Sequence, residues 1–114
     1  MSFPRPDEAT KAYFHNLVDL DERIRIRPMF GNIAAFVNGN MFSGLFGSQV
    51  FVRLPEQERA ELLAVEGAGP FEPMEGRRMK EYVSLPEAWR SEPDSARHWV
   101  QRSLRWVGQM KPKD

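Results

Sequence analysis

Apolar residues follow a helical period at both ends of the chain. Over residues 7–20 they recur at three- and four-residue intervals, which predicts an amphipathic helix with Asp7 as its N-cap. Over residues 93–110 the same period places Trp99 and Trp106 on one broad arc. We therefore expect a C-terminal helix that lies across a sheet and buries both tryptophans.

The middle of the chain alternates between apolar and other residues, as half-buried strands do. In residues 23–27 the isoleucines fall on one face and the arginines on the other. Asn38-Gly39, which tolerates positive φ, is a strong hairpin signal and indicates antiparallel neighbours. The expected strands are residues 23–27, 33–37, 41–45, 49–54 and 79–85.

A further helix is expected over residues 55–66, with Pro55 in its first position and Ala60 and Leu63 facing a core. The sequence thus predicts an α+β fold. It has an antiparallel sheet of about five strands in a meander, with N-terminal, middle and C-terminal helices, in two layers. Residues 1–114 are expected to form a single domain.

The second strand is apolar on both of its faces. Ile33, Ala35 and Val37 share one face, and Ala34 and Phe36 share the other. A sheet that is apolar on both faces needs cover on both. Either the helices divide between the two faces, or a second subunit covers one of them, which makes a homodimer one of our expectations.

Composition narrows the class of protein. The 16 basic and 16 acidic residues give a formal net charge of zero, and the absence of cysteine excludes disulfides, thiolate metal sites and a cysteine nucleophile. No apolar run approaches the ~20 residues of a membrane span. The first residues lack the apolar stretch of a secretory signal. We expect a cytoplasmic protein without membrane contact.

No catalytic motif is visible. His15 and His98, the two histidines, fall on different helices, and neither has a second metal ligand three or four residues away. There is no G-x-S-x-G elbow, and the glycines match neither nucleotide-binding spacing. The paired carboxylates lie in polar stretches, where nothing raises a pKa for acid catalysis. We expect no enzyme activity, no metal and no cofactor.

Clustered cations suggest an alternative, a nucleic-acid-associated protein that uses the basic strand and the C-terminal helix. A second alternative is a small-ligand pocket between the sheet and the last helix, lined by Arg27, Tyr82 or His98. The basic groups are Arg23, Arg25 and Arg27; Arg77, Arg78 and Lys80; and Arg97, Arg102, Arg105, Lys111 and Lys113.

Two motifs resemble the TfoX (Sxy) N-terminal domain family, which reads R-x-M-F-G and then G-x-M-F. Here they are Arg27-Pro28-Met29-Phe30-Gly31 and Gly39-Asn40-Met41-Phe42. Residues 76–86 also resemble the family's later strand, and the likeness covers roughly residues 10–108. The resemblance implies a small α+β layer with an antiparallel sheet and no established catalytic residues.

TfoX-like proteins are bacterial regulators of competence genes that act with a transcription activator such as the cyclic-AMP receptor protein. Full-length regulators carry a second domain, whereas this chain ends after its last expected helix, so we expect a stand-alone member. The interpretation is a non-enzymatic regulatory or adaptor domain that contacts a protein partner. Methionines and aromatics beside arginine are typical of interfaces, so the candidate interaction surface is Arg27, Met29, Phe30 and Met41.

Overall fold

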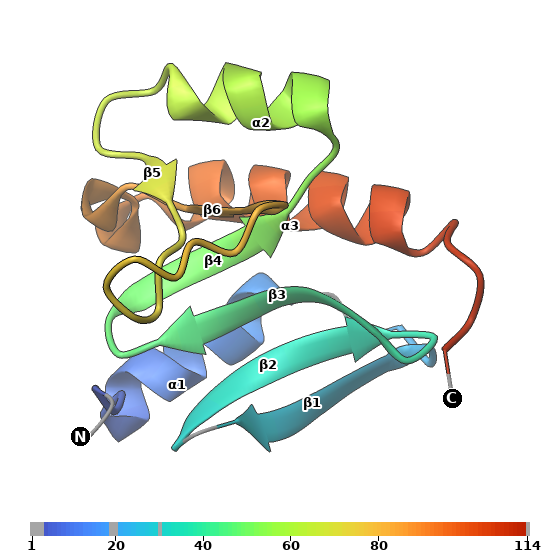
Figure 1. Ribbon diagram of the computed structural model, residues 1–114. Helices are drawn as coiled ribbons and strands as arrows, with labels where there is room; N and C mark the ends of the chain where they lie inside the picture. The colour runs from blue at the N-terminus through green and yellow to red at the C-terminus, as the bar shows by residue number, and fades with distance from the viewer. Residues whose placement is uncertain (1–3, 19–20, 30, 114) are drawn as a thin grey trace.

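A computed structural model describes residues 4–18, 21–29 and 31–113, and confirms the α+β class (Figure 1). One antiparallel sheet has the strand order β1-β2-β3-β4-β6-β5. The elements are α1 (Glu8–Leu17), β1 (Ile24–Met29), β2 (Asn32–Val37), β3 (Asn40–Phe46), β4 (Gln49–Arg53), α2 (Glu56–Leu63), β5 (Gly69–Pro70), β6 (Tyr82–Ser84), the 3-10 helix η1 (Glu87–Ser91) and α3 (Pro93–Val107).

The predicted meander is confirmed from β1 to β4, and the turn residues Asn38 and Gly39 both have positive φ, at 51° and 82°. The last predicted strand is shorter than expected, because only Tyr82–Ser84 joins the sheet as β6. The sheet has six strands instead of five because the two-residue β5, Gly69–Pro70, pairs with β6 at the edge. The sequence pattern did not predict β5, because two residues are too few to show the alternation of a strand. Its proline is consistent with a place at the edge of the sheet.

Helices α1 and α3 pack on the same face of the sheet, behind it in the view of Figure 1, and the main core lies between them and the strands. Phe14 and Leu17 of α1 and Val100 of α3 are fully or almost fully buried there. Helix α2 packs against β6 and adds Leu62 to the same core. The helices therefore do not divide between the two faces of the sheet.

The ends of the helices partly follow the predictions. Asp7 caps α1, since its Oδ1 accepts a hydrogen bond from the Thr10 N–H at 2.8 Å, and this bond lowers the pKa of the Asp7 carboxyl.

Trp99 is buried on α3, with 7% of its surface exposed, but Trp106 is only half-buried at the border of the core. The prediction that both tryptophans are buried is therefore wrong for Trp106.

The middle helix is turned relative to the prediction. Pro55 is the N-cap and not the first helical residue, and the helix begins at Glu56. Leu62 is fully buried, whereas Ala60 and Leu63 face solvent. The segment has almost no amphipathic pattern of its own, so its contact with β6 decides which leucine enters the core.

A bulge in β3 decides which side chains reach each face of the sheet. Ala35 pairs with Ser43 and the next residue of β2, Phe36, pairs with Met41, so Phe42 is the extra residue. Phe42 consequently joins the core on the helix side, and Met41 packs with the residues of the opposite face. Strict alternation from Ser43 would have placed Met41 on the helix side.

The buried hydroxyl of Ser103 on α3 satisfies the backbone around this bulge. It donates a hydrogen bond to the carbonyl oxygen of Phe42 and accepts one from the Arg53 N–H at 3.2 Å. One side chain thereby links α3 to both β3 and β4.

We predict that Ser103→Ala lowers the free energy of unfolding by about 1–3 kcal/mol, because it leaves a buried carbonyl and a buried N–H without partners. Chemical denaturation of the purified protein measures this change. Ser91→Ala is the control, since the Ser91 hydroxyl is exposed and donates to the nearby Ala88 carbonyl. Equal stability of the two variants would contradict the role given to Ser103.

Candidate interaction surface

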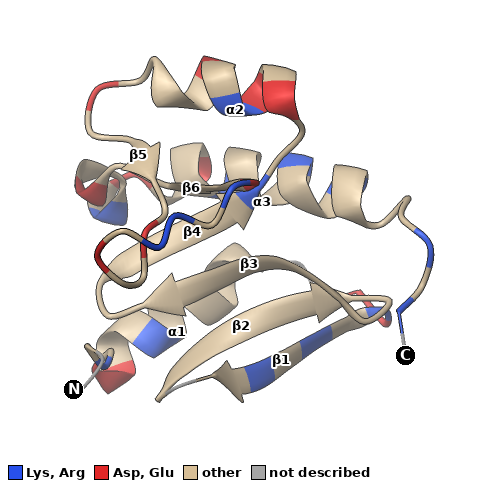
Figure 2. Cartoon of the chain, in the orientation of Figure 1, with Lys and Arg blue, Asp and Glu red and all other residues tan. Residues whose placement is uncertain are grey.

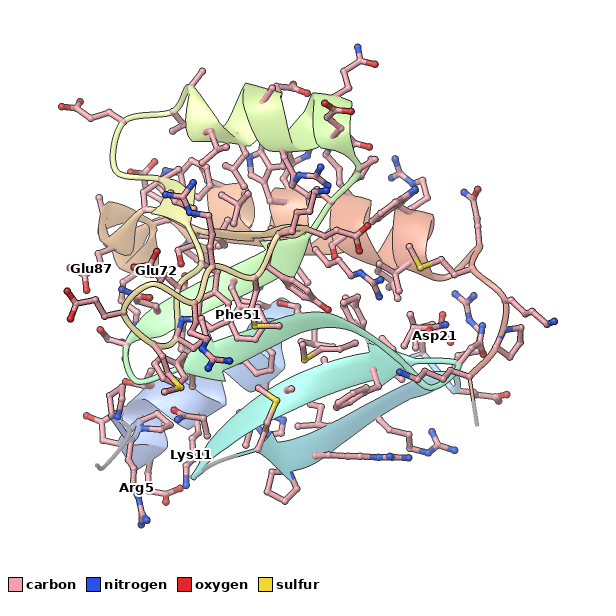
Figure 3. The ribbon with its side chains drawn as sticks, in the orientation of Figure 1. Arg5, Lys11, Asp21, Phe51, Glu72 and Glu87 are labelled. Carbon is pink, nitrogen blue, oxygen red and sulfur yellow. The ribbon has the colours of Figure 1, made fainter. Side chains whose placement is uncertain are left out.

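The face of the sheet opposite α1 and α3 is covered over β4 by residues 71–81, which we call the covering segment. Its Phe71 stacks on Phe51 with ring centroids 4.1 Å apart and packs edge-on against Phe46 at 5.6 Å. Figure 3 labels Phe51 on β4, where the covering segment crosses in front of the sheet. These aromatic rings, with Met79, form a second and smaller core.

The ring of Phe51 has room because Gly44 on β3 has no side chain. A Cβ at Gly44 would lie 2.3 Å from the Phe51 Cζ atom. Such an overlap would displace the ring and, with it, the Phe71 ring stacked above. The second core therefore depends on glycine at this position.

We predict that Gly44→Ala lowers the free energy of unfolding by about 1–3 kcal/mol through this overlap. Gly69→Ala in β5 is the matched control, because nothing lies within 4 Å of a Cβ built there. Neither glycine has positive φ, so backbone strain does not separate the two variants. Thermal unfolding followed by circular dichroism should show a clear loss for the first and little change for the second; equal losses would contradict this account.

The rest of this face, over β1, β2 and part of β3, has no helix in front of it (Figure 1). We call it the open face. The residues that form it are the exposed Arg25 and Arg27 and the half-buried Met29, Phe36 and Met41.

Strand pairing brings these side chains together. In the antiparallel register, Phe36 of β2 pairs with Arg25 of β1 on one side and with Met41 of β3 on the other. The guanidinium carbon of Arg27 lies 5.5 Å from the centre of the Phe36 ring, a cation–π distance. The open face is thus an apolar centre bordered along β1 by cations, which are the blue bands of β1 in Figure 2.

Three of the four residues proposed from the sequence, Arg27, Met29 and Met41, lie on this face. Phe30 falls outside the described residues. Phe36 also belongs to this surface, although the sequence pattern indicates only that it lies on the opposite face of β2 from Ala35 and Val37. The missing information was its pairing with Met41, which depends on the bulge.

Beyond Met41, the open face ends at a group of polar contacts that are already satisfied. Arg53 pairs with Glu81 at 2.8 Å, and both the Arg53 guanidinium and the Tyr82 hydroxyl donate to the Met41 carbonyl at 3.4 Å. The Arg53 guanidinium also lies 5.7 Å from the centre of the Tyr82 ring, and burial raises the pKa of Tyr82. The charges of Arg53 and Glu81 therefore compensate each other at this border.

The three arginines of the basic strand differ in their pairing. Arg23 forms an ion pair with Asp21 at 2.9 Å, with a second hydrogen bond at 3.1 Å, and these bonds lower the pKa of Asp21 to about 2. Arg25 donates to the backbone carbonyls of Glu22 and Ile24. Within the described part of the chain, neither Arg25 nor Arg27 has a carboxylate partner.

Replacing Arg23 with Gln is expected to raise the pKa of Asp21 part of the way from about 2 toward its ordinary value of 3.8, because the guanidinium bonds are lost while the hydrogen bond from the residue 23 N–H remains. The lowered pKa favours folding above pH 3.8, and that contribution disappears as the pH falls through about 2. NMR titration of the Asp21 carboxyl measures the pKa. Arg25→Gln should leave it unchanged, and a similar rise in both variants would contradict the pairing.

The backbone edge of β1 is poorly suited to accept another strand. Ile24, Ile26 and Pro28 direct their backbone groups to the same side, and proline has no N–H to offer. The Ile24 N–H already bonds Asp21, and its carbonyl accepts from Arg25 at 3.0 Å. Such devices protect edge strands, so we regard the face of the sheet, and not its edge, as the interaction surface.

The cations of the C-terminal helix are mostly engaged within the fold. Arg97 pairs with Asp94 at 3.0 Å. Arg102 pairs with Glu58 at 2.7 Å and with Glu61 at 2.8 Å. Paired cations bind phosphates less readily, because the anion must displace a carboxylate. This pairing weakens the alternative of a nucleic-acid surface on α3.

The structure does not bring together the residues of the expected ligand pocket. Arg27 and Tyr82 lie on the face of the sheet that is turned away from α3, and His98 is exposed on α3, edge-on to the Trp99 ring. The space between sheet and α3 is filled by buried apolar side chains. Among the described residues, no group of three or more metal-ligating side chains lies close enough to hold an ion.

These features define a small α+β domain whose sheet is closed by helices on one face and partly open on the other. The sequence model of the TfoX N-terminal domain family matches residues 8–106, so the chain belongs to this family. No curated protein matches the chain. None of the helices in the described ranges has the length and apolar character needed to cross a membrane.

Proposed function

We propose that this chain is a non-catalytic regulatory domain that binds a protein partner through the open face. The observation that carries the proposal is the half-buried group Met29, Phe36 and Met41 beside two arginines that have no carboxylate partner in the part of the chain that the structure describes. Methionine, aromatic and arginine side chains are enriched in interfaces, where they supply much of the binding energy.

The charge of the open face indicates the chemistry of the partner. Arg25 and Arg27 border the apolar centre, so a complementary surface presents apolar side chains flanked by carboxylates. A second copy docked along β1 would bring these arginines toward their own counterparts, which is unfavourable. Membership in the TfoX family supports a search among transcription regulators, with the family's activator partners as the first candidates.

Photo-crosslinking tests this proposal. With benzoylphenylalanine in place of Phe36, we expect adducts to a partner protein inside cells, and we expect the crosslinked peptide of that partner to be rich in Asp and Glu. Adding Arg27→Glu should reduce the adduct yield several-fold because the charge complementarity is reversed. The matched control, Arg105→Glu on the exposed side of α3, should leave the yield unchanged.

Other results would overturn the proposal. An adduct between two copies of the chain would make the open face a self-association surface. An adduct to nucleic acid would identify a different class of partner. Equal yields from the photoreactive residue at Phe36 and at Arg105 would show that the open face is not selective.

A further inference from the structure

A second surface, separate from the open face, lies between α2 and the residues that lead into β6. It consists of two adjoining hollows of about 610 and 400 Å³ that share Arg59, Met79, Lys80 and Tyr82. We call this surface the α2 groove. Both hollows are shallow and open to solvent, and their volumes fall in the range of small-molecule sites.

Apolar groups supply part of the lining of the α2 groove. Met79, Tyr82 and Val83 line it from the sheet side, and Pro70 and Leu63 line it at one end. Leu63 is one of two large hydrophobic side chains in the described ranges that are clearly exposed, at 42%. Leu63 is not buried by the packing of α2 against the sheet. The apolar part of a ligand in the groove would cover its side chain.

Cations line the groove from both of its sides, and Figure 2 marks in blue the basic positions of α2 and of the segment before β6. Arg59 is anchored by a hydrogen bond from its Nη1 to the Leu54 carbonyl, and its guanidinium has no carboxylate partner within the described ranges. Lys80 has no ion pair among the described residues, and Arg78 is 3.9 Å from Glu72.

The acidic residues of the groove compensate this charge only in part. Glu81 is already neutralised by Arg53 at 2.8 Å on the side of the open face. Glu56, at the start of α2, also lines the groove and is the one carboxylate there without an ion pair among the described residues. The two cations without an ion pair among the described residues, Arg59 and Lys80, therefore outnumber the one unpaired carboxylate.

From this combination we infer that the α2 groove binds a small amphipathic anion. The apolar body of the ligand lies on Met79, Tyr82 and Leu63, and its carboxylate, sulfonate or phosphate is held by Arg59 and Lys80. The site does not depend on the proposed function, because Arg59, Leu63 and Lys80 are not part of the open face and Tyr82 lies at the border between the two surfaces.

Two fluorescent probes with the same kind of aromatic body test the inference. Anilinonaphthalene sulfonate carries a negative charge, and N-phenylnaphthylamine is neutral. We expect the folded protein to bind the sulfonate probe more tightly than the neutral one. Lys80→Gln should lower the affinity for the sulfonate probe about two- to five-fold, the range of an exposed ion pair. The affinity for the neutral probe should not change.

Two further variants test whether charge near the groove controls binding of the sulfonate probe. Glu56→Gln removes the opposing charge and should strengthen binding of the sulfonate probe. Lys111→Gln removes an exposed cation from the C-terminal segment, away from the groove, and should have no effect. All three substitutions are at exposed side chains, so the variants are expected to fold.

The location of the probe decides the remaining question. NMR amide shifts should concentrate at residues 59, 63 and 79–83. Shifts centred on Arg27 and Phe36 would place the probe on the open face and overturn the inference. Absence of saturable binding, equal affinity for both probes, or unchanged affinity in Lys80→Gln would overturn it as well.

Discussion

The bulge at Phe42, together with the hydroxyl of Ser103, is the constraint on which the rest of the structure depends. A bulge leaves a backbone group of the strand unpaired, and Ser103 satisfies the Phe42 carbonyl from the core side of α3. The same hydroxyl also accepts a hydrogen bond from the Arg53 N–H. Ser103 therefore fixes the position of α3 relative to both β3 and β4. The bulge turns Met41 away from the helices and so divides the side chains of β3 between two cores.

The two faces of the sheet are completed in different ways. The helix side is closed by α1, α2 and α3 around a continuous apolar core. The opposite side is closed only over β4, where Phe51, Phe71 and Phe46 pack above Gly44. The apolar residues of β1 and β2 on that side keep partial exposure, which suits association with another molecule.

The basic residues of the molecule fall into two groups, those with a carboxylate partner and those without one among the described residues. On the exposed side of α3 and at the start of β1, arginines are paired with nearby carboxylates and contribute modestly to stability. Arg25 and Arg27 on the open face, and Arg59 and Lys80 in the α2 groove, have no such partner among the described residues. Between these two surfaces, Arg53, Glu81 and Tyr82 form a border whose polar groups are satisfied by one another.

By itself, the sequence determined the features that depend on neighbours along the chain. The alternation in β1, the Asn38-Gly39 turn and the Asp7 cap are local, and all three are present in the structure. The tertiary structure alone decided the features that depend on distant contacts: that Leu62 and not Leu63 enters the core, that Gly69–Pro70 joins the sheet, and that Met41 lies beside Phe36. A residue's own pattern shows that it has an apolar side to bury, but the partner that covers that side is set by pairing between strands and helices far apart in sequence.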